Sequence, residues 1–227
     1  MQNNEKASLS TTTANTLRSW VHFFIVEIRD LEHDAILWEN RCENDLGNDA
    51  TVSVDTLDAR FQQTKTPHPT NKGENILNED LHSYKFNGPA LRWELASSLL
   101  SNHVVHVNGP CSPGKTNDLE MFRSDLKDKL DPGERVVADD IHVGDAPKHV
   151  VCPACCTTTE EQIVVMKRIE GRHEVLKGHV KSWKCLQGFK RKGSPAEKVE
   201  KHNNFFRACV VTKQVEMEMG FGEVHEV

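Results

Sequence analysis

The stretch VVHVNGPCSPGKTNDLEMFRSDLKDKLDPGERVVADD, residues 104–140, decides the fold of this chain. It predicts a strand, a loop, a helix and a second strand. The apolar run 104–107 begins the first strand, and the prolines and glycines that follow break it. Asn117 or Asp118 can cap the helix that comes next. Four apolar residues recur in that helix at helical spacing: Leu119, Phe122, Leu126 and Leu130.

The second half of this stretch ends in two carboxylates. The tripeptide Asp131-Pro132-Gly133 stops the helix, and residues 135–138 form a short buried strand that ends at Asp139 and Asp140. Open α/β sheets bind ligands at the carboxyl ends of their strands. Carboxylates that gather there repel one another unless a cation neutralises them. The pattern therefore predicts an α/β sheet with a cation site at one edge.

The flanking segments extend this sheet. Residues 51–55 (TVSVD) alternate, which predicts a strand that ends at Asp55 with its valines on one face. Residues 84–86 and 91–100 are further strand candidates. The second of these should pair with residues 104–107 through a turn at Ser101-Asn102. Residues 141–156 show no periodicity and are expected to be a loop.

Two helices should close the domain. The first runs from Thr159 to Trp183, and its apolar stripe consists of Val165, Ile169, Leu176, Val180 and Trp183. Glu174 lies almost opposite this stripe, on the face that carries Lys181. The second helix covers residues 203–219, with Phe206, Val210, Val211 and Val215 on one side.

Composition suits one soluble domain with a tail. The chain has 227 residues, of which 37% are hydrophobic and 27% charged. It has no apolar run of membrane-spanning length, and residues 20–28 lack the flanks of a signal peptide. We expect an intracellular protein. Residues 1–16, rich in Ser, Thr and Asn, should be disordered, and a short helix should follow over 17–31.

The charge distribution points to a polyanionic partner. The net charge is −6, yet residues 166–201 contain eleven Lys or Arg and four Glu, a local balance of +7 that leaves −13 for the rest. A basic segment beside an acidic body suits a metal-dependent enzyme that acts on DNA. The alternative is that these charges lie on solvated helix faces.

Five blocks of the sequence, taken in order, resemble a Harbinger-type DDE transposase. They are SVD (53–55), VNGPCSPGKTNDLEMFR (107–123), ERVVADD (134–140), GDAPKHVVCP (144–153) and RHEVLKGHVKSW (172–183). The resemblance covers roughly residues 35–219. It implies an RNase H-like fold, a mixed central sheet flanked by helices. Residues 1–34 would precede this domain, 64–80 would be a surface insertion, and 220–227 a tail.

The resemblance also implies a site and a reaction. Asp55, Asp118 and Glu174 would be the catalytic carboxylates, and Asp139 a further metal ligand near them. Two Mg²⁺ or Mn²⁺ ions would then support phosphodiester cleavage and strand transfer. The expected partners are DNA and a separate Myb-like DNA-binding protein in the nucleus, with no membrane and with homo-oligomerisation left open. Four basic residues would hold DNA phosphates: Arg168, Arg172, Lys177 and Lys181.

Departures from the family pattern keep a second hypothesis open. The Gly-Tyr that usually follows Asp139 and a small residue is replaced by Ile141-His142, and Thr56-Leu57 stands in place of Gly-Thr. The helical DNA-binding segment common in the family is not evident in the N-terminal part. These features favour a catalytically inactive or domesticated relic that acts as a DNA-binding protein.

A third hypothesis concerns zinc. Cys152, Cys155 and Cys156 form a CxxC with one extra cysteine, whereas a structural zinc site usually needs two such pairs. We expect seven reduced cysteines and no zinc.

The metal hypothesis predicts two properties of the carboxylates. Asp55, Asp118 and Asp139 should converge at one end of the sheet, because each was placed at a strand end. Asp118→Asn should also leave the stability of the metal-free protein nearly unchanged, and it should abolish stabilisation of the protein by magnesium.

Overall fold

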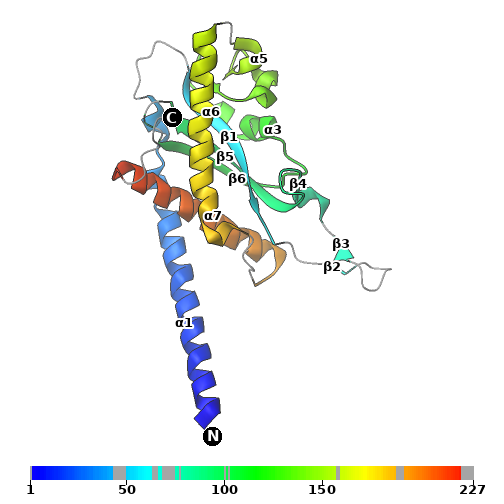
Figure 1. Ribbon diagram of the computed structural model, residues 1–227, viewed down its shortest axis with the longest axis vertical. Helices are drawn as coiled ribbons and strands as arrows, with labels where there is room; N and C mark the ends of the chain where they lie inside the picture. The colour runs from blue at the N-terminus through cyan, green and yellow to red at the C-terminus, as the bar shows by residue number, and fades with distance from the viewer. Residues whose placement is uncertain are drawn as a thin grey trace.

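In the computed structural model, a six-stranded mixed sheet forms the centre of the protein (Figure 1). The structure describes residues 2–42, 50–62, 66–67, 75–76, 78–99, 101, 103–156, 159–187 and 192–220. The strands of the sheet are β1 (Ala50–Arg60), β4 (His82–Ser83), β5 (Gly88–Ser98), β6 (Val104–Cys111), β7 (Arg135–Val137) and β8 (Val150–Val151). A separate pair joins β2 (Thr66–Pro67) to β3 (Asn75–Ile76).

The sheet has an antiparallel half and a parallel half. Its order is β4-β5-β1-β7-β8, and β6 also pairs with β5. β5 runs antiparallel to β1, β4 and β6, whereas β1, β7 and β8 are parallel. The parallel half therefore places the carboxyl end of β7 beside the middle of β1, where Val137 pairs with Ser53.

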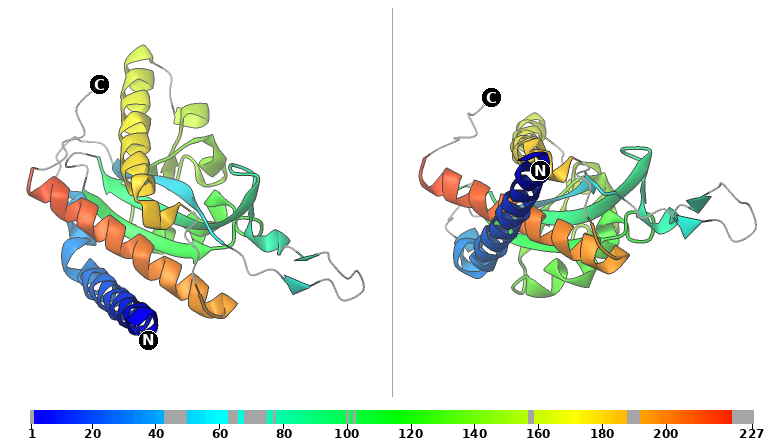
Figure 2. Two further views of the ribbon diagram at one scale, coloured as in Figure 1. Left: turned by 60° about the horizontal axis from the view of Figure 1, so that its bottom comes forward. Right: turned by 90° about the horizontal axis from the view of Figure 1, so that it is seen from below.

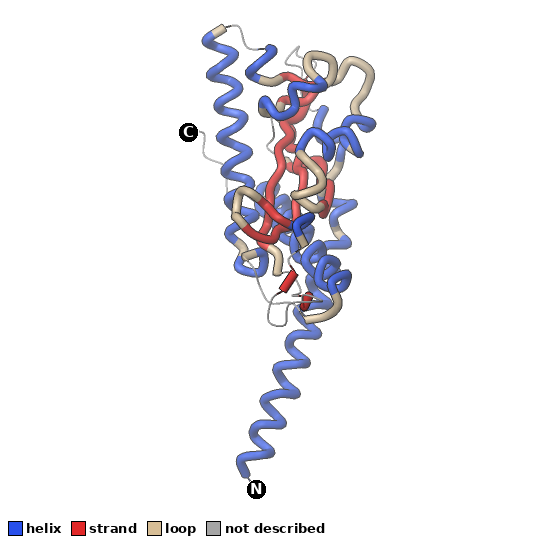
Figure 3. The backbone as a smooth tube through the Cα atoms, turned by 90° about the vertical axis from the view of Figure 1, so that its right-hand side faces the viewer, coloured by secondary structure: helices blue, strands red, loops and turns tan. Residues whose placement is uncertain are grey.

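Helices cover both faces of this sheet (Figures 2 and 3). The helices are α1 (Gln2–Asp30), α2 (Glu32–Ala35), α3 (Asp118–Ser124), α4 (Leu126–Lys129), α5 (Pro153–Cys156), α6 (Glu160–Ser182) and α7 (Pro195–Glu218). Short 3-10 turns are η1 (Trp38–Cys42), η2 (Glu79–Leu81), η3 (Asp140–Asp145) and η4 (Lys184–Leu186).

Strand alternation divides the core into two main clusters. Val52 and Val54 of β1 pack with Phe122 of α3 and Leu126 of α4. Odd-numbered β1 residues such as Leu57 instead face α6 and α7, where Trp93 stacks on Phe206 with ring centroids 4.0 Å apart. Residues of β1 that are adjacent in sequence therefore belong to different layers.

Side-chain caps explain where the helices begin. The Asn117 side chain accepts a hydrogen bond from the Glu120 amide, and Glu120 accepts one from the Asn117 amide. Thr159 and Ser194 cap α6 and α7 with the same reciprocal arrangement. The predicted start of α3 is confirmed with Asn117 as its N-cap, and the helix predicted from Thr159 to Trp183 is confirmed as α6.

Several strand predictions need correction. Asp55 does not end a strand, because β1 continues to Arg60. The expected break at Asn108-Gly109-Pro110 is wrong, since β6 runs to Cys111. Gly109 makes this continuation possible: its φ of +117° is one that side chains rarely adopt, and a β carbon there would lie 2.8 Å from the Arg92 carbonyl oxygen.

Other expectations differ in smaller ways. Residues 84–86 form a turn and not a strand. The predicted loop at 141–156 contains η3, β8 and α5. The predicted pairing of the 91–100 strand with residues 104–107 is confirmed by β5 and β6.

The N-terminal segment is a helix in the structure. Residues 2–16, expected to be disordered, are part of α1, which extends away from the sheet (Figure 1). Arg29 near its end donates a hydrogen bond of 2.7 Å to Asn204 of α7. Of the predicted insertion at 64–80, only part is described, and the tail predicted at 220–227 lies outside the described residues except for Gly220.

Among the described helices, none combines the length and apolar character that crossing a membrane requires.

Candidate functional site

A lysine joins two of the predicted catalytic carboxylates. The Lys177 ammonium on α6 forms an ion pair with Asp55 Oδ2 on β1 and another, 2.6 Å long, with Glu174 Oε1. The Lys177 side chain is only 8% exposed, whereas that of Glu174 is 71% exposed. Burial alone would lower the pKa of Lys177, but the two carboxylates outweigh it and the pKa is raised. A fixed positive charge therefore lies between Asp55 and Glu174.

Asp139 lies two residues beyond the parallel strand β7, as the N-cap of η3. Ser53 of β1 pairs with Val137 of β7, so each aspartate follows a paired residue by two positions. Asp139 Oδ1 lies 2.8 Å from His142 Nδ1 and accepts a hydrogen bond from the Ile141 amide. The hydrogen bond from His142 is the main reason that the pKa of Asp139 is lowered. Register thus places Asp139, just past the end of β7, near the part of β1 that carries Asp55.

His173 anchors α6 beneath this edge. Its Nε2 donates to the Ser53 carbonyl oxygen at 3.0 Å and lies 3.1 Å from Ser97 Oγ. The side chain is fully buried, and desolvation lowers its pKa, so the neutral ring is favoured. Lys177 follows His173 by one helical turn, which directs its side chain toward Asp55.

Asp118 belongs to a different network on the opposite face of the sheet. Arg92 Nη1 donates to Asp118 Oδ1 at 2.7 Å, and Arg92 Nε donates to Asp58 Oδ1 at the same distance. Ser83 Oγ donates a further hydrogen bond of 2.5 Å to Asp58. Burial would raise the pKa of Asp58, but the hydrogen bonds from Arg92 and Ser83 outweigh it and the pKa is lowered. The contacts therefore join Asp55 to Glu174 through Lys177, and Asp118 to Asp58 through Arg92.

This placement changes the expected effect of Asp118→Asn. The variant should lose about 1–3 kcal/mol of stability without any metal, because it removes the charge that faces buried Arg92. The sequence alone led us to expect no change, since Asp118 was then only a helix cap or a metal ligand. Urea unfolding of Asp118→Asn measures this loss of stability. Asp128→Asn, at an exposed residue of α4, is the control. Equal stability of both variants would contradict the ion pair.

The four predicted DNA-binding residues differ in accessibility. Arg168 is exposed and Lys181 is half-buried. Arg172 Nη2 donates to the Leu99 carbonyl oxygen at 2.7 Å, and Lys177 is enclosed by Asp55 and Glu174. Only Arg168 and Lys181 are therefore placed to meet DNA without breaking these contacts.

The residues as arranged do not fit a pair of magnesium ions. Among the described residues, no group of three or more His, Cys, Asp or Glu is placed to hold a metal ion. A divalent ion between Asp55 and Glu174 would need the oxygen atoms that Lys177 occupies, and would meet its positive charge at close range. Magnesium chemistry at this edge would first require the ammonium to leave.

The cysteine group is equally incomplete. Cys152 is buried, and its Sγ lies 3.1 Å from Sγ of Cys155. The side chain of Cys156 lies outside what the structure describes. Two neighbouring thiols do not make a four-ligand zinc site.

No family model, no curated protein and no solved structure matches this chain. The site must therefore be interpreted from its own geometry.

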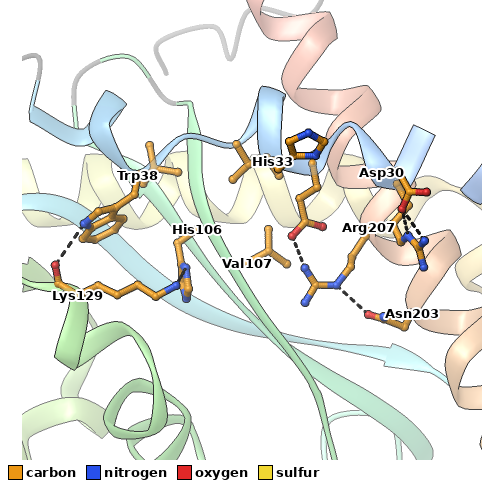
Figure 4. A pocket seen from close by; sticks show the side chains of 12 residues that line it. Asp30, His33, Trp38, His106, Val107, Lys129, Asn203 and Arg207 are labelled. Carbon is orange, nitrogen blue, oxygen red and sulfur yellow. Dashed lines mark hydrogen bonds and ion pairs between the residues drawn. The ribbon is translucent and has the colours of Figure 1, made fainter. Parts of the chain in front are cut away.

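A cavity of about 620 Å³ lies away from this cluster, between the N-terminal helices, β6 and α7 (Figure 4). The charged side chains on its wall are paired with one another. Arg207 forms an ion pair with Glu32 and donates to Asn203 at 3.0 Å, and Trp38 Nε1 donates to the Lys129 carbonyl oxygen at 3.2 Å. These contacts attach α2 to α7 and η1 to α4.

Sequence reasoning missed the role of Lys177. We assigned it to DNA because it lies in a basic segment. However, it follows Ile169 by eight residues and His173 by four, which places it on the buried stripe of α6. A lysine in such a stripe signals a buried acidic partner. Asp58 and Arg92 had no comparable signal, since their pairing depends on the register of β1 with β5.

Proposed function

We propose that this chain is a transposase-derived protein with an RNase H-like fold that binds DNA without cutting it. Lys177 is the observation that carries this proposal. Its ammonium occupies the position between Asp55 and Glu174 that a divalent cation would need. A lysine supplies one positive charge and no open coordination position, so it can neutralise the carboxylates but cannot activate water as a metal ion does.

The sheet supports the RNase H-like part of the proposal. The resemblance implies a mixed central sheet with helices on both sides, and the chain has a mixed six-stranded sheet flanked by helices. Asp55 lies on β1 and Asp139 two residues past the end of the parallel strand β7, and Lys177 of α6 joins Glu174 to Asp55. An inactive relic would retain this framework, with the Lys177 ammonium in the place of a metal ion.

The DNA-binding part rests on the charge of α6 and the segment after it. Lys167, Arg168 and Lys184 are exposed in a region with a local balance of +7. Lysine and arginine side chains on such a surface neutralise phosphates without reading bases. On this proposal the protein acts in the nucleus, alone or with a Myb-like partner.

Salt dependence tests this DNA surface. The logarithm of the binding constant for duplex DNA should fall by about 0.9 per log unit of salt for each phosphate neutralised. The double variant Arg168→Glu with Lys184→Glu should flatten that slope, whereas Lys148→Glu, on an exposed lysine outside the basic segment, should not. Fluorescence anisotropy over a salt series measures both. Equal slopes in both variants would show that DNA binds elsewhere.

A second candidate is a metal-dependent DNA endonuclease with strand-transfer activity. The parallel pairing of Ser53 with Val137 favours it, since Asp55 and Asp139 each follow this pair by two residues and metal-dependent nucleases need neighbouring carboxylates. Under this candidate, Lys177 releases Asp55 and Glu174 when DNA and Mg²⁺ or Mn²⁺ bind. Duplex DNA incubated with each ion separates the two functions. Cleavage that is lost in Glu174→Gln supports the nuclease, and intact DNA with retained binding supports the relic.

A further inference from the structure

Two cysteines that the proposed function does not use form a close pair beside the sheet. Cys152 directly follows β8, and Cys155 lies in the short helix α5 (Figure 1). Their Sγ atoms are 3.1 Å apart, and the Cys155 amide donates a hydrogen bond of 3.3 Å to the Cys152 carbonyl oxygen. Because both sulfur atoms belong to one tight turn, a disulfide between them needs rotation of the side chains and no movement of a distant segment.

The two thiols differ in their access to solvent. Cys155 is exposed, whereas Cys152 is fully buried in the core cluster that contains Val136 and Val150. Burial and the contact with Cys155 raise the pKa of the Cys152 thiol. The thiolate is the form of cysteine that attacks a disulfide. A dissolved reagent therefore meets Cys155 first, and Cys152 is the sulfur next to it that can displace the reagent.

Neighbouring contacts hold this turn on both sides. The Ala138 amide donates to the Val151 carbonyl oxygen at 3.0 Å, which fixes the chain just before Cys152. The Ala154 amide, between the two cysteines, donates to Asp140 Oδ1 at 2.7 Å and fixes α5 against η3. Groups held in contact react with each other faster than with a second dissolved molecule. The second thiol should therefore act within the chain.

A second sulfur contact lacks this combination of an exposed and a buried thiol. Cys185 Sγ and Cys209 Sγ lie 3.7 Å apart, but Cys209 is buried and Cys185 packs against the core cluster around Trp93. Among the cysteines whose side chains the structure describes, Cys155 alone is exposed. A reagent in solution should thus reach the pair at 152 and 155 in preference to the other pair.

We propose that Cys152 and Cys155 form a site of reversible thiol–disulfide exchange, and that its substrate is a low-molecular-weight disulfide such as glutathione disulfide. The Cys155 thiol loses its proton to water, and the thiolate attacks one sulfur of glutathione disulfide. The bond between the two glutathione sulfurs breaks, and one glutathione leaves as a thiolate.

The second step closes the protein disulfide. Cys152 loses its proton and attacks the Cys155 sulfur, which releases the second glutathione. Both glutathione thiolates take up the protons that the two cysteines lost. Two protein thiols are thereby oxidised to one disulfide, and one glutathione disulfide is reduced to two thiols. Excess reduced glutathione drives the same steps in reverse.

Glutathione redox buffers test this site. The full chain is equilibrated with mixtures of reduced and oxidised glutathione, and remaining thiols are then alkylated. In oxidising mixtures the intact chain should lose two hydrogen atoms, and peptide mapping should place the disulfide between Cys152 and Cys155. Excess reduced glutathione should restore both thiols. A chain that stays reduced in the most oxidising mixture would overturn the proposal. So would a disulfide that maps only to Cys156 or to the pair of Cys185 and Cys209.

Three variants separate the roles of the two thiols. Cys155→Ser, at an exposed position, should lose the disulfide and bind no glutathione at the buried Cys152. Cys152→Ala keeps the core position apolar and should trap a mixed disulfide between Cys155 and glutathione. Cys156→Ser removes the adjacent thiol and, as the matched control, should form the disulfide as wild type does.

Circular dichroism spectra matching wild type identify the variants that fold. A folded Cys152→Ala chain without glutathione on Cys155 would contradict the attacking role of Cys155. Loss of the disulfide in Cys156→Ser would contradict the assignment of the pair, and so would a disulfide that persists at Cys152 in Cys155→Ser.

Discussion

Replacing Arg92 with methionine is expected to destabilise the fold by about 4 kcal/mol. The Arg92 guanidinium forms ion pairs with Asp58, which is fully buried, and with Asp118, which is nearly so. Removal of the cation leaves two carboxylates without their main partner at a largely buried site. Methionine fills most of the space of the arginine side chain. The loss of stability therefore measures the missing charge and not a cavity.

Arg123→Met is the matched control, because Arg123 pairs with Asp145 from a side chain that is 45% exposed. Exposed pairs contribute little, so this variant should lose less than about 1 kcal/mol. Urea unfolding at neutral pH measures both variants. A similar small loss in the two would mean that the Asp58–Arg92–Asp118 network does not form.

Glu94 should make stability fall as the pH rises. Its carboxyl group is fully buried on β5, and among the described residues neither oxygen accepts a hydrogen bond of good geometry. Asn108 is close enough to oppose the effect of burial on the pKa. Desolvation raises the pKa from 4.5 to about 8. Between pH 4.5 and about 8, the folded state binds the Glu94 proton more tightly than the unfolded state does. The contribution of Glu94 is therefore complete below pH 4.5 and is lost as the pH rises through about 8.

In wild type, this group alone should give a slope of about −1.4 kcal/mol per pH unit in that range. Glu94→Gln removes the titrating group. Above pH 8, the free energy of unfolding of this variant should exceed that of wild type by several kcal/mol, which is the free energy that corresponds to the pKa shift of Glu94. Glu170→Gln on the exposed surface of α6 is the control. Urea titrations from pH 5 to 9, a range of roughly four units around the shift, measure the slopes. Parallel curves for wild type and Glu94→Gln would show that Glu94 is not protonated in the folded state.

Local chemistry allowed much of the fold to be predicted. Thr159 and Trp183 bound α6 because a capping side chain and a change in apolar periodicity are both visible in the sequence. The same holds for β7, whose Val136 and Val137 are buried as expected. The extension of β1 past Asp55 was not visible. Asp58 breaks the apolar alternation there, and only its pairing with Arg92 on the next strand makes a buried aspartate tolerable.

The candidate site could be predicted only in part, for a related reason. Asp55 and Asp139 are separated by 84 residues, and their proximity follows from parallel strand register. Asp118 is close to Asp139 in sequence but faces Arg92 across the other layer of the core. Strand alternation decides which carboxylates share a face of the sheet. The sequence analysis ended β1 at Asp55, so it could not follow the alternation through the rest of this strand.

A magnesium titration of wild type beside Lys177→Met tests most directly whether Lys177 replaces a metal ion. The melting temperature of wild type should not rise with Mg²⁺, because the ammonium already holds Asp55 and Glu174. Lys177→Met should gain a saturable rise, as ligand binding to the native state alone requires, and Glu174→Gln added to it should abolish that rise. A saturable rise in wild type that Glu174→Gln removes would contradict the proposal, since Lys177 would then yield its position to the metal.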